Sequence, residues 1–113
     1  MTDILVVKTT TDRQDHAEHL ARLLVSERLA ACVQIVGPIQ SVYRWQGTVT
    51  SAAEWQLWIK TRQTCWEQLR QKIIAKHHYE TPEILALPVA AGADGFVQWI
   101  NAETRSAERG ASP

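Results

Sequence analysis

The sequence has no excess of one charge and no long apolar run. Its 12 lysine and arginine residues balance 12 acidic residues, so no net charge attracts nucleic acid or an anionic membrane surface. No apolar run reaches the roughly 18 residues that a membrane span needs, and no basic-then-apolar leader is present. We therefore expect a cytoplasmic protein that binds neither nucleic acid nor a membrane.

Cysteine and catalytic motifs are also scarce. Cys32 lies in an apolar run and Cys65 beside a helix start, so we predict free thiols rather than a disulfide. Phosphate-binding loops, dinucleotide-binding glycines, paired zinc ligands and a nucleophile elbow are all missing from the sequence. Cys32 could act as a nucleophile with His77 as its base, but a thiol between alanine and valine is more typical of a core residue. We predict no enzymatic activity.

Length and composition indicate one ordinary globular domain over residues 1–113. The chain has 113 residues, of which 45% are hydrophobic and 21% charged. Residues 102–113 lack periodicity and are predicted to form a frayed tail. The unusual count is five tryptophans, a residue type enriched at interfaces and in binding clefts.

A long hairpin is predicted between Ala31 and Lys60, reversing at Trp45-Gln46-Gly47. In its second half Trp55, Leu57 and Ile59 alternate with polar residues, as in a strand with two different faces. Both arms are about twice the usual 5–6 residues. Pro38 cannot donate to a strand ladder, so the first arm is expected at the edge of the sheet, with a bend or bulge. An edge this long needs a partner, so we expect an oligomer.

The remaining patterns complete a βαββαβ order with an extra C-terminal helix. This order predicts an α+β, ferredoxin-like sandwich in which two helices cover one face of a four-stranded sheet and a second subunit covers the other. The expected elements are a strand over Ile4–Val7, a helix from a Thr11–Gln14 capping box to Arg28-Leu29, a helix from a Thr64–Glu67 capping box to Lys76-His77, a strand over Ile84–Val89, and a terminal helix from Asp94 that buries Phe96, Trp99 and Ile100.

Two groups of residues are candidates for binding. His77 and His78 suit copper or zinc by residue type, although neighbouring side chains diverge and would need donors from elsewhere in the chain or from another subunit. Trp45, Lys60, Tyr79 and Glu83 are expected at strand ends. They could form either a small polar pocket or an interface rim with a Lys60–Glu83 ion pair.

Several stretches, in order along the chain, together resemble the CutA divalent-cation-tolerance family. The resemblance implies a homotrimer similar in architecture to the P-II signalling proteins, with hairpins that pair across subunits, copper binding and polar pockets between subunits. By matching motif it implies the pocket residues Cys32, Trp45, Glu54, Lys60, His77, Tyr79 and Glu83. The stretches are Glu27–Val33, Ser41–Gly47, Glu54, Lys60-Thr61, His77 with Tyr79–Glu83, and Trp99-Ile100.

This chain departs from the family pattern at two positions. His78 stands where members commonly have proline, and Thr9 stands where some bacterial members have a cysteine. The leading hypothesis is a non-enzymatic homotrimer of copper or other divalent metal tolerance. The alternative is a P-II-like sensor that binds a nucleotide or an organic anion between subunits.

Overall fold

A computed structural model describes residues 2–105 of the chain. The described residues form four strands and three α-helices in the predicted order. They are β1 (Ile4–Thr11), α1 (Gln14–Ser26), β2 (Cys32–Trp45), β3 (Thr48–Arg62), the short 3-10 helix η1 (Gln63–Cys65), α2 (Trp66–Lys76), β4 (Ile84–Pro88) and α3 (Asp94–Glu103).

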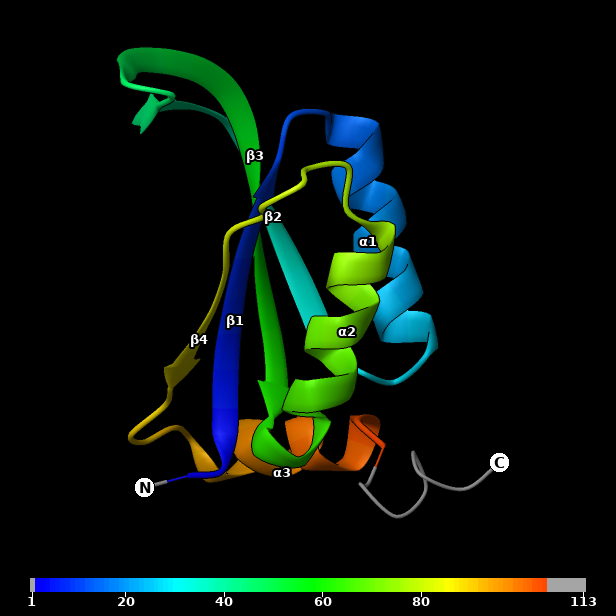
Figure 1. Cartoon of the computed structure of the whole chain (residues 1–113). Coiled ribbons are helices and arrows are strands. Elements are labelled where there is room, and N and C mark those ends of the chain that lie inside the picture. The colour runs from blue at the N-terminus through cyan, green and yellow to red at the C-terminus, as the bar shows by residue number, and fades with distance from the viewer. Residues whose placement is uncertain (1, 106–113) are drawn as a thin grey trace.

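The strands form one antiparallel sheet in the order β2-β3-β1-β4. Helices α1 and α2 cover one face of this sheet, and α3 lies across one end of it (Figure 1). This arrangement confirms the α+β, ferredoxin-like prediction with an extra C-terminal helix. No helix within residues 2–105 is both long and apolar enough to cross a bilayer.

The core lies between the sheet and the two covering helices. The alternation in β3 is confirmed, because Leu57 and Ile59 are fully buried on the helix side. Across the β1–β3 register Ile59 pairs with Val7, which is also fully buried. The apolar stripes of α1 and α2 complete the cluster with Ala17, Leu20, Ala21, Leu24, Leu69 and Ile73.

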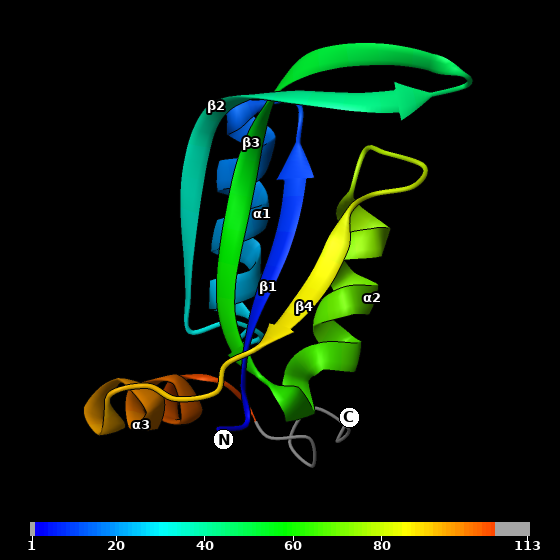
Figure 2. The same ribbon diagram turned by 90° about the vertical axis from the view of Figure 1, so that its left-hand side faces the viewer.

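The hairpin has the length and the edge position that the sequence predicts. Strand β2 has 14 residues and β3 has 15, and β2 is an edge strand with a register shift between Val36 and Ile39, at Pro38. Gln46 and Gly47 both have positive φ, at 51° and 81°, as a two-residue hairpin turn requires. Strand β1 ends at Thr11 opposite Trp55, so the hairpin projects beyond the rest of the sheet and bends over (Figure 2).

Both predicted capping boxes are wrong. Thr11 still belongs to β1, so its hydroxyl cannot cap α1 and instead bonds His16 Nδ1 at 2.7 Å. Helix α1 has Arg13 at its N-cap position, without a side-chain cap, and it ends at Ser26 rather than at Arg28-Leu29. At the second box η1 precedes α2, and Glu67 pairs with Arg70 within the helix.

The terminal helix buries less than the sequence predicts. Ile100 is only 2% exposed and clusters with Ile4, near the start of the chain. Phe96 and Trp99, in contrast, are 49% and 42% exposed. These two rings stack on each other with centroids 5.7 Å apart. The predicted tail also begins too early, because Ala102 and Glu103 belong to α3; residues 106–113 lie outside the described part of the chain.

Candidate functional site

The projecting hairpin and the loop between α2 and β4 enclose a hollow of about 660 Å³, which we call the hairpin hollow. Its wall includes four of the residues that the sequence singles out: Trp45, Glu54, Tyr79 and Glu83. They come from the end of β2, from β3 and from the loop before β4. The structure therefore brings together residues that lie up to 38 positions apart in the sequence (Trp45 to Glu83).

Tyr79 and Glu54 form the central contact of the hairpin hollow. The Tyr79 hydroxyl donates a hydrogen bond to Glu54 Oε2 at 2.7 Å, and Glu54 is only 9% exposed. Burial and then this hydrogen bond to the carboxylate raise the pKa of Tyr79 above its ordinary value. The hydroxyl consequently stays protonated and ties the loop to the base of the hairpin.

The ion pair of Glu83 is with Lys8, which corrects the expected Lys60–Glu83 pair. Lys8 Nζ lies 3.1 Å from Glu83 Oε2. Lys8 pairs with Leu85 across β1–β4, beside the loop, whereas Lys60 pairs with Val6, further along β1. The register therefore takes Lys60 out of reach of the loop.

Lys60 and Cys32 lie together, but away from the hairpin hollow. They face each other across β2 and β3 on the sheet face that no helix covers, and Lys60 Nζ donates to Gln34 Oε1. Cys32 and Cys65 are both free thiols, as predicted. The His77 ring bonds the carbonyl of Thr10, near the C-terminal end of β1, whereas Cys32 lies level with Val6 near the other end. The structure therefore does not bring Cys32 and His77 together as a nucleophile and its base.

His77 uses both of its ring nitrogens inside the fold. Nε2 lies 2.7 Å from the Thr10 carbonyl oxygen, which can only accept, so Nε2 carries the proton. Nδ1 lies 3.0 Å from the Tyr79 backbone nitrogen and accepts its N–H. Burial, followed by the nearby His16 and His78, lowers the pKa of His77 below its ordinary value. His77 is thus a neutral clamp between β1 and the loop, and it has no lone pair left for a metal.

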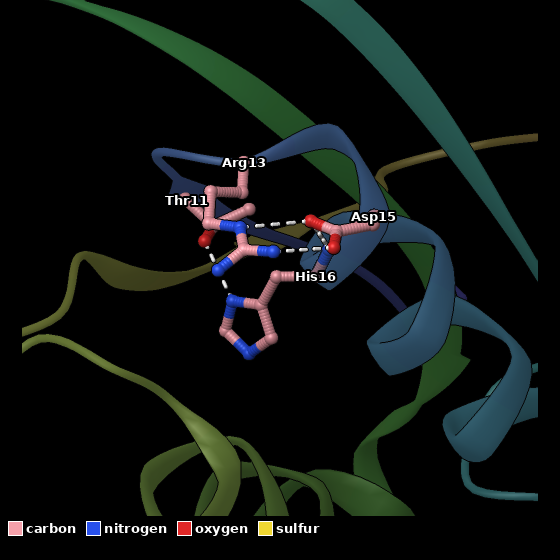
Figure 3. A network of polar contacts seen from close by, with 4 residues as sticks. All are labelled: Thr11, Arg13, Asp15 and His16. Carbon is pink, nitrogen blue, oxygen red and sulfur yellow. Dashed lines mark hydrogen bonds and ion pairs between the residues drawn. The ribbon is translucent and has the colours of Figure 1, made fainter.

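His16 is a second clamped imidazole, which the sequence analysis missed. Its Nδ1 accepts from the Thr11 hydroxyl at 2.7 Å, and its Nε2 donates to the Lys76 carbonyl at 3.1 Å (Figure 3 shows the Thr11 contact and the neighbouring Arg13–Asp15 ion pair). Burial lowers the pKa of His16. The sequence feature that could have predicted its burial is its position next to Ala17, on the apolar stripe of α1 that faces the core.

His78 is the exposed member of this cluster. Its ring centroid lies 3.8 Å from that of His16, and it lines a second hollow of about 500 Å³ together with His19, Asp15 and Lys76. Within residues 2–105, no three or more histidine, cysteine, aspartate or glutamate side chains are grouped so that they could hold a metal ion. The His77–His78 metal site therefore stays a prediction.

The fold and the hollow define a class: a ferredoxin-like domain with an overlong hairpin that shapes a polar pocket. Residues 5–103 match the family model described as CutA1 divalent ion tolerance protein. The divalent-cation tolerance protein CutA of Thermus thermophilus is 41% identical over 99 residues, covering 88% of this chain and 96% of that protein. The chain therefore belongs to the CutA1 divalent ion tolerance family.

Solved structures agree with the family assignment. The divalent cation tolerance protein (Cut A1) of Thermus thermophilus superposes with a TM-score of 0.88 at 40% identity, covering 90% of this chain and 99% of that one. CutA of Xylella fastidiosa gives a TM-score of 0.90 at 36% identity, covering 92% and 100% of the two chains.

One longer relative bears on location. The chloroplastic CutA of Arabidopsis thaliana is 43% identical over 102 residues, which are 90% of this chain but 56% of that protein. The chain thus spans little more than half the length of this plant relative. A solved CutA of Archaeoglobus fulgidus is named periplasmic, so the names of family members differ in compartment and the cytoplasmic location stays a prediction.

Proposed function

We propose that the protein is a non-enzymatic homotrimer of divalent metal tolerance, which binds copper or another small ligand at the seams between subunits. The observation that carries this proposal is the projecting hairpin. The part of β3 between Thr48 and Glu54 pairs with β2 on one side, and β1 does not extend far enough to pair with it on the other. The ribbon exposes apolar side chains, among them Val49 at 63%, which does not line the hairpin hollow. An exposed apolar ribbon with an open edge calls for strand pairing with another copy.

The sheet face opposite the helices supports the same assembly. On this face β4 exposes Leu85 and Leu87, at 54% and 45%, and β2 exposes Val36 at 46%. The stacked Phe96 and Trp99 add apolar surface at the end of the sheet. Burial of such surface between copies contributes roughly 25 cal/mol for each Å² removed from water, which is the driving force for subunit association.

For the metal, His78 is the donor that this chain offers. His77 does not fit the role, because a metal would have to displace either the Thr10 carbonyl or the Tyr79 N–H from its ring. His78 is exposed and has no such constraint among the described residues. Since imidazole suits copper and one subunit holds no complete ligand set, we propose that a neighbouring subunit contributes the other donors.

Two measurements on the same protein test the two parts of the proposal. Light scattering on the purified chain should give three times its mass of 12.8 kDa, and Val49→Asp should lower that mass because it places a charge on the apolar ribbon. Ile74→Asp is the matched control, since Ile74 is an exposed apolar residue on α2, away from the hairpin. Copper(II) calorimetry on the same trimer should show binding that His78→Ala weakens. A single-subunit mass for the unmodified chain refutes the assembly, and unchanged isotherms refute the role of His78.

A further inference from the structure

We infer that the hairpin hollow binds a small organic ammonium ion, held between the carboxylate of Glu54 and the aromatic rings of the hairpin. The inference rests on the proposed function in one respect, because assembly of the subunits must leave the hollow open. It assigns a chemical class of ligand to this site: a cation that carries N–H donors on an apolar frame.

The charge of the hollow selects a cation. Three carboxylates line it, Glu54, Glu80 and Glu83, against the single ammonium of Lys8, which gives a formal charge of −2. Lys8 is already paired with Glu83 at 3.1 Å. Glu54 and Glu80 therefore remain without a charged partner among the residues that line the hollow. A nucleotide or another organic anion would meet net repulsion here, which argues against the P-II-like alternative.

Glu54 points independently to a ligand that donates hydrogen bonds. Its side chain is nine-tenths buried, and Tyr79 satisfies only Oε2. Within residues 2–105, Oε1 has no hydrogen-bond partner, although the residue lines the hollow. Oε1 keeps some accessible surface, so a ligand in the hollow can reach it. Because a largely buried carboxylate is costly unless donors or a positive charge compensate it, an ammonium N–H group directed at Oε1 would supply both.

The aromatic walls favour an organic cation over a bare metal ion. Tyr43, Trp45 and Tyr79 line the same hollow, and the faces of such rings attract ammonium groups and pack against their alkyl chains. Hard divalent ions prefer a cage of several oxygen ligands, and a small ion would not fill about 660 Å³. A hollow of this volume falls in the range of roughly 300–1,000 Å³ that is typical of small-molecule sites.

Spermidine is a suitable probe, because it carries primary and secondary ammonium groups on an alkyl chain. We expect saturable binding to the full chain by calorimetry in 150 mM salt. Glu54→Gln keeps an acceptor for the Tyr79 hydroxyl but removes the charge, so it should weaken binding about tenfold or more. Trp45→Ala should weaken binding about threefold to tenfold. Glu18→Gln removes the same charge from the exposed face of α1 and should leave binding unchanged.

The outcomes separate this inference from the proposed function. Light scattering on the same samples reports assembly, and calorimetry reports the ligand. A trimer that does not bind spermidine, or that binds it equally with Glu54→Gln, overturns the ammonium site and leaves the assembly standing. Glu54-dependent binding by a single subunit supports the site and refutes the trimer. Glu54-dependent binding of ATP or citrate, with none of spermidine, overturns the charge argument.

Discussion

Replacement of His77 by alanine should destabilise the fold in the absence of any metal. The imidazole joins the Thr10 carbonyl to the Tyr79 N–H through bonds of 2.7 and 3.0 Å, so the alanine variant leaves one acceptor and one donor unpaired. Each lost bond costs about 1 kcal/mol net. Loss of the ring contact with Tyr79, at 4.8 Å between centroids, adds about 0.5–1 kcal/mol. The free energy of unfolding should therefore fall by about 2–3 kcal/mol.

His78→Ala is the control for this prediction. His78 is the next residue, is also a histidine, and is exposed. Its replacement loses the ring contact with His16 but no hydrogen bond, so the free energy of unfolding should fall by only about 0.5–1 kcal/mol. Urea unfolding followed by tryptophan fluorescence, with EDTA and at one protomer concentration, measures both variants. A thermal scan should show a fall of roughly 10 °C for His77→Ala. Equal stability of the two variants would refute the clamp, and a loss seen only with metal present would return His77 to the metal site.

Two further predictions concern pH and backbone space. Burial lowers the pKa of His16 and His77 in the folded protein, whereas the unfolded chain takes up protons near pH 6.5, so the free energy of unfolding should fall as the pH drops from 7.5 to 5.5. Urea titrations at the two pH values measure this loss, and a His16→Gln, His77→Gln variant that keeps the full slope would contradict it. Gly37→Ala would place a Cβ 2.4 Å from Trp55 Cδ1 and should cost about 1–3 kcal/mol. Gly95 lies in α3, and a Cβ added there would have no atom within 4 Å, so Gly95→Ala should instead stabilise the fold by about 0.5–1 kcal/mol. Calorimetric melting measures both glycine variants, and a higher melting temperature for Gly37→Ala than for Gly95→Ala would refute the packing argument.

The predictions that proved correct came from patterns within a single helix, strand or turn. The alternation from Trp55 to Ile59 records which side chains face the helices, because successive residues of a strand point to opposite faces. Gly47 and Pro38 are backbone constraints that act at their own positions, so they reported the turn and the irregular edge correctly. The stretches shared with the CutA family predicted the family correctly, because members of one family share a fold.

Contacts between elements were the part that the sequence could not determine. Glu83 pairs with Lys8 rather than Lys60 because the β1–β4 register places Lys8 beside the loop, and no local pattern encodes that register. The clamps of His16 and His77 likewise depend on the end of α2 lying against the end of β1. By itself, then, the amino-acid sequence determined the strands, the helices, the long hairpin and the family, through periodicity and local backbone chemistry. Only the tertiary structure decided which charges and imidazoles meet, because those distances depend on how elements remote in sequence pack together.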